Sequence, residues 1–241
     1  MSKNKFSGGN GNVQIGRGTM IMCGSGNIQA GGSIIINRQK VSGVEGINGC
    51  GIIDTEERPI GITSRSIRIK SEIAADIFVS CGASQSRVVI TAEKNIIPLI
   101  QAEVLGECLT VKTTKNFNAF HSIRLNLDVP SLDSFTQNGS GDVSIKGVAG
   151  AIFSVSLLGQ GDISVDGFAN ELQLVLNGVG DIEACGLKAK KADLSLKGVG
   201  DISAFATETV HATLSGVGDI IIRGNPRVSS SCSGVGEIRT E

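Results

Sequence analysis

Tryptophan and tyrosine are absent from this chain of 241 residues, and the aromatic content is only 3%. Sites for single-stranded nucleic acid usually stack bases on aromatic rings. The composition therefore argues against such a site and, by extension, against a sugar site built on stacked rings. A formal net charge of −1 gives no electrostatic reason to expect nucleic acid or an anionic membrane as a partner. No nucleic-acid partner is expected.

Long apolar runs are also missing, since no stretch approaches the roughly 18 apolar residues of a membrane span. No membrane span is therefore expected. Lys3 and Lys5 near the N-terminus have no apolar run behind them, so no signal peptide is visible. The protein is expected either to stay in the cytoplasm or to use an export signal outside the numbered chain, and the compartment stays open.

Sequence motifs for metal, redox and nucleophilic chemistry are missing as well. The cysteines have no Cys-x-x-Cys spacing and fit buried free thiols better than disulfides. They are Cys23, Cys50, Cys81, Cys108, Cys185 and Cys232. His121 and His211 each stand alone on polar positions of expected strands, so a metal site is not predicted. A Gly-x-Ser-x-Gly elbow for a serine nucleophile is absent. We predict no cofactor, no metal and no catalytic residue.

Glycine is plentiful, and one glycine-rich phrase recurs six times in the last hundred residues. It reads Gly-Ser-Gly-Asp-Val at 139–143, Gly-Gln-Gly-Asp-Ile at 159–163, Gly-Val-Gly-Asp-Ile at 178–182, 198–202 and 216–220, and Gly-Val-Gly-Glu-Ile at 234–238. Its glycine–acid pairs are Gly141 and Asp142, Gly161 and Asp162, Gly180 and Asp181, Gly200 and Asp201, Gly218 and Asp219, and Gly236 and Glu237. Successive acids are 20, 19, 20, 18 and 18 residues apart. A near-constant period of this length indicates a stacked repeat.

Each repeat contains two strand-like pieces in which apolar and polar side chains alternate. A unit of this size cannot bury its apolar face alone, but stacked units form a continuous core. Each coil would pair in parallel with the next at roughly 4.8 Å. We predict an all-β fold, a single-stranded parallel β-helix with roughly 18–20 residues per coil in the C-terminal half. Cys232 falls in an inward slot taken by leucine in earlier units, which favours packing over reactivity.

The chain is expected to divide into two parts. Residues 1–53 form a Gly/Asn-rich extension, read either as irregular β structure or as a leader. Residues 54–241 form the predicted β-helix domain. Residues 66–129 have strand-like alternation, interrupted by one plausible helical turn at 93–101, which Pro98 keeps short.

Five features of the sequence occur in a specific order. They are Thr-Glu-Glu-Arg-Pro-Ile at 55–60, Ala-Glu-Lys-Asn-Ile-Ile-Pro-Leu-Ile at 92–100, Val-Pro-Ser-Leu at 129–132, the recurring phrase, and Gly-Asn-Pro-Arg-Val at 224–228. Together they resemble a known family, the bacterial putative autotransporter-adhesin head GIN domain, a domain of unknown function. The resemblance covers about 54–241. It implies a right-handed parallel β-helix, an adhesive role, and a place in the cell envelope or outside the cell.

The ladder of acids has three interpretations. Acids on neighbouring coils would lie near the roughly 5–5.5 Å separation of a retaining glycosidase pair. Carboxylates and turn carbonyls also suit calcium, although the calcium-binding nonapeptide has about half this period. The favoured interpretation is structural, because a turn needs glycine for positive φ and aspartate to cap backbone amides. The glycine–acid pairs are then a turn ladder.

We therefore expect a non-enzymatic β-helix that serves as a structural, adhesive or ligand-presenting surface module in bacteria. The alternative is a β-helix polysaccharide lyase or glycoside hydrolase that uses acids on neighbouring coils. Expected partners are a glycan or protein surface ligand and, through exposed coil ends, further copies of the chain in a homo-oligomer. Local function, if any, is expected in 183–210 or in the first fifty residues.

Overall fold

The computed structural model describes residues 13–15, 20–22, 28–30, 34–36, 39–41, 47–61 and 66–241. Five short strands precede residue 47: β1 (Val13–Ile15), β2 (Met20–Met22), β3 (Ile28–Ala30), β4 (Ile34–Ile36) and β5 (Gln39–Val41). Strand β1 pairs with β3 and β2 with β4, both in parallel, and β5 lies antiparallel to β4. The rest of the first 46 residues, including Cys23, lies outside the described part, and no side chain there is placed.

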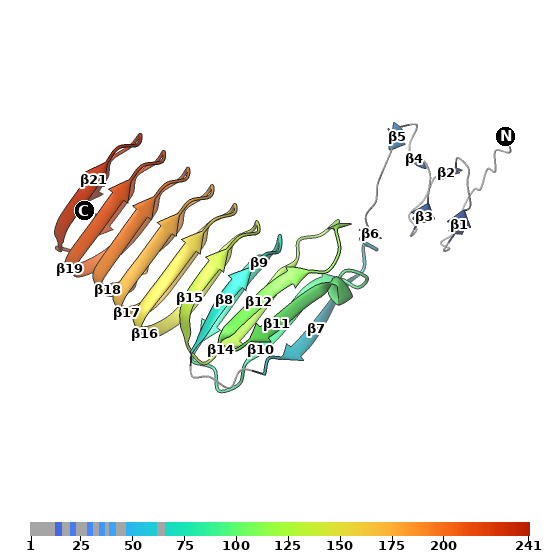
Figure 1. Ribbon diagram of the computed structural model, residues 1–241. Coiled ribbons are helices and arrows are strands. Elements are labelled where there is room, and N and C mark those ends of the chain that lie inside the picture. The colour runs from blue at the N-terminus through green and yellow to red at the C-terminus, as the bar shows by residue number, and fades with distance from the viewer. Residues whose placement is uncertain are drawn as a thin grey trace.

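Two layers of strands make up the body of the molecule. Figure 1 shows how the strands follow one another along its length. Strands before the repeats are β6 (Ile47–Asn48), β7 (Ile53–Pro59), β8 (Ile67–Ser71), β9 (Asp76–Cys81), β10 (Arg87–Glu93), β11 (Ile100–Leu105), β12 (Cys108–Thr113), β13 (Phe117–Asn118), β14 (Arg124–Val129) and β15 (Leu132–Gln137). The repeats form β16 (Val143–Leu157), β17 (Ile163–Leu176), β18 (Ile182–Leu196), β19 (Ile202–Leu214), β20 (Ile220–Arg223), β21 (Arg227–Cys232) and β22 (Ile238–Thr240). The helical turn is η1 (Ile97–Leu99), inside the range predicted for it.

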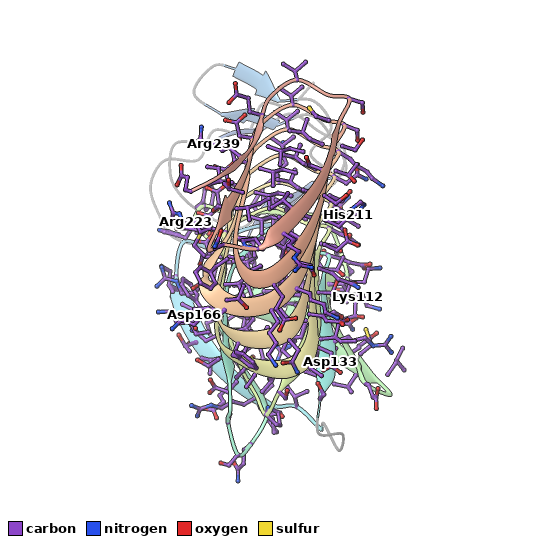
Figure 2. The ribbon with its side chains drawn as sticks, turned by 90° about the vertical axis from the view of Figure 1, so that its left-hand side faces the viewer. Lys112, Asp133, Asp166, His211, Arg223 and Arg239 are labelled. Atoms are coloured by element: carbon purple, nitrogen blue, oxygen red, sulfur yellow. The ribbon has the colours of Figure 1, made fainter. Side chains whose placement is uncertain are left out.

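The long strands β16 to β19 bend, so that each contributes to both layers. Layer A contains, in order, β7, β10, β14, β9, the first halves of β16 to β19, β20 and β22. Layer B contains β11, β12, β8, β15, the second halves of β16 to β19, and β21. Seen along the stack in Figure 2, each coil is a flattened loop, with Asp166, Arg223 and Arg239 outside layer A and Lys112, Asp133 and His211 outside layer B.

The predicted parallel β-solenoid is confirmed, with about five turns in the C-terminal half. Parallel register joins Val143 to Ile163, Ile163 to Ile182, and Ile182 to Ile202. These steps of 20, 19 and 20 residues equal the spacing of the acids. Because the register advances by nearly the same number of residues per coil, side chains of the same type lie above one another. The apolar positions of successive coils therefore form continuous columns.

The core lies between the two layers. Inward side chains such as Val155, Leu174 and Leu194 are fully buried, as the alternation predicts. The last coil differs: Val228, Ser230 and Cys232 are in register with buried Val210, Ala212 and Leu214 but are themselves exposed. The expectation that Cys232 packs in the core is therefore wrong, because no further coil covers this position among the described residues.

Antiparallel pairs close the opposite end of the stack. Strand β10 runs antiparallel to both β7 and β14, and β11 forms a hairpin with β12. The division of the chain at 53/54 stays a prediction. The segment 47–51 contacts this closed end: Ile47 pairs with Phe117, and Gly51 donates its N–H to Glu93.

Candidate functional site

The acids of the turn ladder lie at the corner where each coil passes from layer B to layer A. One carboxylate oxygen of each of the first five acids accepts the backbone N–H of the acid in the next coil. The bonds run from Asp162 N–H to Asp142 Oδ1 (3.1 Å), Asp181 to Asp162 (2.9 Å), Asp201 to Asp181 (2.8 Å), Asp219 to Asp201 (2.7 Å) and Glu237 to Asp219 (2.9 Å). All six carboxylates therefore come together in one column.

The ladder begins one coil earlier than the repeated phrase. Asp76 Oδ1 accepts the N–H of Asp142 at 3.4 Å, and Ala74 stacks on Ser140 at the same corner. Sequence reasoning missed Asp76 because the text before it, Glu-Ile-Ala-Ala, lacks the two glycines. The only available signal was its position directly before Ile77, the first inward residue of β9.

Glycine is required at the corner for two separate reasons. Gly200 has φ +134°, a conformation that side chains rarely adopt, and a Cβ there would lie 2.0 Å from the carbonyl oxygen of Gly180. The backbones of adjacent corners approach too closely for any side chain.

A hollow of about 240 Å³ opens on the outer surface of layer A beside this corner. Its lining residues are Phe78, Asp142, Val143, Ser144, Asp162, Ile163, Ser164, Asp181 and Glu183. Register explains the shape: Phe78, Ser144, Ser164 and Glu183 follow one another on four adjacent strands. Two small serines between two large side chains leave the space empty.

The hollow combines groups that suit a polar ligand with one apolar surface. The Phe78 ring is 41% exposed, and the Arg124 guanidinium lies 5.5 Å from its centroid. Carboxylates accept hydrogen bonds, and serine hydroxyls donate and accept them. Sequence analysis singled out the acids but not Phe78, Ser144, Ser164 or Glu183, because outward positions of a strand carry no pattern of their own. Apart from Glu183, the hollow lies outside the stretch 183–210.

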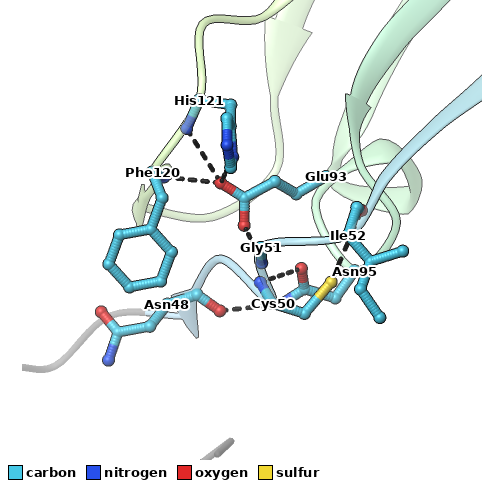
Figure 3. A network of polar contacts seen from close by, with 8 residues as sticks. All are labelled: Asn48, Cys50, Gly51, Ile52, Glu93, Asn95, Phe120 and His121. Carbon is cyan, nitrogen blue, oxygen red and sulfur yellow. Dashed lines mark hydrogen bonds and ion pairs between the residues drawn. The ribbon is translucent and has the colours of Figure 1, made fainter. Parts of the chain in front are cut away.

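A second polar cluster surrounds Glu93 at the closed end of the stack (Figure 3). The Glu93 side chain is completely buried. Its Oε1 accepts the N–H groups of Phe120 (2.5 Å) and His121 (3.0 Å), and its Oε2 accepts that of Gly51 (2.9 Å). Burial raises the pKa of Glu93, but these backbone donors and the His121 side chain outweigh it and hold the pKa below its ordinary value.

The same cluster secures the segment 48–51 against the body. Asn95 accepts the N–H of Cys50 at 3.0 Å and donates to the carbonyl of Asn48 at 2.7 Å. A Cβ on Gly49 would lie 1.7 Å from Glu93 Oε2, so only glycine lets the segment cross the buried carboxylate. We call Glu93, Asn95 and the segment 48–51 the clasp.

The two histidines differ in their surroundings. The sequence predicted a strand position for His121, but the residue lies in the loop before β14. Its Nδ1 is 3.5 Å from Glu93 Oε1 there. His211 is exposed on layer B. Within residues 47–61 and 66–241 no three histidine, cysteine or acidic side chains gather as a metal-ion group.

Five of the six cysteines fall in the described ranges, and all five are free. The five are therefore free thiols, as expected, but Cys50, Cys81, Cys108 and Cys185 are only half-buried and Cys232 is exposed. Burial raises the pKa of the Cys81 thiol to about 11, with a smaller contribution from the negative charge of Asp166. None of the helices in the described part is long and apolar enough to cross a bilayer.

The fold and its corner ladder define a β-solenoid of stacked, nearly identical coils. The family model for the putative auto-transporter adhesin, head GIN domain, matches residues 67–226. The chain belongs to this family, so the resemblance seen in the sequence is confirmed. A comparison with curated proteins finds no match.

Three of the solved structures that this chain resembles come from Bacteroides fragilis and Parabacteroides distasonis. A putative adhesin from Bacteroides fragilis is 27% identical with a TM-score of 0.65, and the match covers 81% of this chain and 100% of that one. A putative lipid binding protein from Parabacteroides distasonis is 20% identical with a TM-score of 0.47, covering 81% and 99%. A putative adhesin from the same species is 18% identical with a TM-score of 0.46, covering 82% and 100%.

Proposed function

We propose that this protein is a non-enzymatic surface module, a rigid solenoid that presents a ligand-binding face in an adhesive role. The observation that carries the proposal is the equivalence of the ladder acids. Each bonds the next coil through the same atom, so the ladder supports the fold along its whole length. The family, and the adhesin from Bacteroides fragilis with its similar fold, support an adhesive role.

The ladder is a poor catalytic pair for a physical reason. Glycoside hydrolysis needs two carboxyl groups in different environments, one protonated and one ionised. Asp142, Asp162 and Asp181 occupy equivalent places, and each accepts one backbone N–H. Equivalent environments do not separate an acid from a base. A lyase or hydrolase therefore remains the weaker alternative.

The ligand face we propose is the hollow beside Phe78. Its carboxylates and hydroxyls would bond the hydroxyl groups of a glycan, and the exposed ring of Phe78 would pack against the apolar face of a sugar. Chemistry of this kind also accepts a polar protein segment, so an array carrying both glycans and peptides is the suitable probe.

Binding to a glycan and peptide array, with a hydrolysis screen on the same glycans, tests this proposal. Wild type should bind without cleaving, and Phe78→Ala and Asp162→Asn should each weaken binding about tenfold. A tenfold loss corresponds to about 1.4 kcal/mol, which is about the contribution of one hydrogen bond to a charged group or of one aromatic contact. The matched control is Asp193→Asn, an exposed acid on layer B, which should bind normally. Hydrolysis that disappears in both Asp162→Asn and Asp181→Asn would instead establish the enzyme.

Calcium should leave the thermal stability of the protein unchanged. One oxygen of each ladder aspartate is already bonded to a backbone N–H, and successive carboxylates come from separate coils rather than from one loop, whereas calcium takes six to eight converging oxygens. Melting curves with excess calcium and with chelator should have the same midpoint. A higher midpoint in calcium that Asp181→Asn abolishes would contradict this expectation.

A further inference from the structure

The hollow on layer A carries a negative charge that nothing in its lining balances. Its carboxylates belong to Asp142, Asp162, Asp181 and Glu183, and none of the lining side chains is basic. All four acids are exposed, and exposed carboxylic acids are ionised at neutral pH. None of the four forms an ion pair with another residue of the ranges 47–61 and 66–241. Lys146, the only basic residue of β16 and β17, does not line the hollow. The hollow therefore attracts cations.

These acids keep oxygen atoms available for a ligand. In Asp142, Asp162 and Asp181, Oδ1 accepts the backbone N–H of the next coil. The second oxygen of each of these carboxylates has no hydrogen-bond partner among the described residues, and neither oxygen of Glu183 has one. Successive coils are roughly 4.8 Å apart, so the available oxygens form a short row along the hollow. One ammonium group, with three N–H donors, matches such a row of acceptors.

One wall of the hollow is an aromatic ring that already interacts with a cation. Phe78 lies on β9, between β14 and β16. From the β14 side, the Arg124 guanidinium lies 5.5 Å from the ring centroid. The face of an aromatic ring attracts cations within about 6 Å, and Phe78 is 41% exposed. The ring and the carboxylates therefore favour the same kind of ligand.

We infer that the ligand of the hollow is a cationic glycan, in which a sugar ring carries a free amino group. This ligand class rests on the proposed function of the hollow and narrows it. The ammonium group would lie among Asp162, Asp181 and Glu183. Hydroxyl groups of the sugar would bond the two serines, and its apolar face would pack against Phe78. The amino group adds charge-assisted hydrogen bonds that a neutral sugar cannot make.

Size and rigidity favour a sugar over a peptide side chain. The volume of the hollow, about 240 Å³, is smaller than the roughly 300–1,000 Å³ of pockets for drug-sized ligands, so it suits one ring rather than a longer segment. A lysine side chain loses more rotamer freedom on binding than most other side chains, whereas a sugar ring is already rigid. Sugars that carry carboxylate or sulfate groups would be repelled by the four acids.

Titration calorimetry on the full chain uses two probes that differ in charge, an oligosaccharide of glucosamine and the same oligosaccharide fully N-acetylated. Acetylation removes the positive charge and keeps the ring. Wild type should bind the amine form at least about tenfold more tightly, because charge-assisted hydrogen bonds are about twice as strong as neutral ones. The preference should shrink between about 0.01 M and about 1 M salt, since the Debye length falls from about 30 Å to about 3 Å.

Two variants test whether the preference arises at the hollow. Ser164→Lys sets a cation among the acids and should weaken binding of the amine form at least about tenfold, because like charges then meet. Its matched control is Gln173→Lys, the same change of charge on the layer B half of β17, which should bind normally. Glu183→Gln should weaken binding of the amine form about threefold and leave the N-acetylated form unaffected. Its control is Glu208→Gln, an exposed acid of β19. Equal melting midpoints would show that all four variants are folded.

Contrary results separate the ligand class from the hollow itself. Equal affinity for the two probes, weakened by Phe78→Ala, would overturn the cationic ligand and leave the hollow as a binding site. Tighter binding of a lysine-rich peptide, or of a neutral or acidic glycan, would overturn it in the same way. A preference for the amine form that Ser164→Lys leaves intact would place the cation elsewhere and overturn it too. If wild type bound neither probe and nothing on the array, the proposed function would also be wrong.

Discussion

Replacing Gly200 with alanine should lower the free energy of unfolding by about 2–5 kcal/mol. The backbone there has φ +134°, and the added Cβ would lie 2.0 Å from Gly180 O and 2.9 Å from Asp181 Oδ1. Holding a non-glycine residue in such a conformation costs about 1–3 kcal/mol, and forcing an extra methyl group into close-packed atoms costs about 1–3 kcal/mol more. The corner backbone must shift, and the bond between the Asp181 carboxylate and Asp201 N–H shifts with it.

Two other glycines separate the conformational cost from the steric one. Gly82 has φ +94° with nothing within 4 Å of a Cβ, and Gly61 has the same free space without positive φ. Gly82→Ala should therefore lose about 1–2 kcal/mol, and Gly61→Ala should change stability by less than about 1 kcal/mol. Denaturant unfolding followed by circular dichroism measures all three. If Gly200→Ala unfolded at the same midpoint as Gly61→Ala, adjacent corners could not approach as closely as the structure shows.

The regular part of the fold could be predicted because its information is local and repeated. The step between Asp162 and Asp181 sets the same register as the pairing of Ile163 with Ile182, and alternation identifies the inward side chains of each strand. The same geometry is encoded in several repeats, so one departure from the repeated phrase, such as Gln at the middle position of Gly159-Gln-Gly161, does not prevent its recognition.

The clasp could not be predicted, because its bonds join residues that are distant in the sequence. Glu93 is 42 residues from Gly51 and 27 from Phe120. Alternation along β10 assigns Glu93 to the outward side, after inward Val88, Ile90 and Ala92. It is buried only because the segment 48–51 crosses the end of the sheet above it.

The hollow and the exposure of the inward side chains of the last coil escaped prediction for a related reason. Their properties depend on what lies on the next coil, and outward side chains such as Phe78 and Glu183 vary freely from repeat to repeat. Val228 and Cys232 follow the inward pattern, but they are exposed because the stack gives them no following coil in the described chain. A repeat pattern predicts which side chains of a coil point inward, but their burial depends on the coils on either side.

Substitution of Glu93 by glutamine should destabilise the protein by about 2–4 kcal/mol at neutral pH. Hydrogen bonds to a charged group contribute about 1.5–3 kcal/mol each, and the amide retains one acceptor oxygen while turning its NH₂ group toward backbone N–H donors. The matched control is Glu103→Gln, an exposed carboxylate 2.7 Å from Lys112. An exposed ion pair contributes at most about 1 kcal/mol, so this variant should remain close to wild type in denaturant unfolding.

The pH dependence of the same pair of proteins distinguishes a charged clasp from simple packing. Because the pKa of Glu93 is lower in the folded protein than its ordinary value of 4.5, its contribution is complete above that value and is lost as pH falls through the folded pKa. Wild type should therefore lose stability in acid more steeply than Glu93→Gln, and the two unfolding midpoints should converge as pH falls below 4.5 and through the folded pKa. A gap that stays constant would mean that folding leaves the pKa of Glu93 unchanged, and a gap that widens as pH falls would mean that folding raises it. Either result would contradict the charged clasp. Since the clasp ties the segment 48–51 to the sheet, the protection factor of the Gly51 amide, which is its exchange rate corrected for the intrinsic effect of pH, should fall over the same acid range.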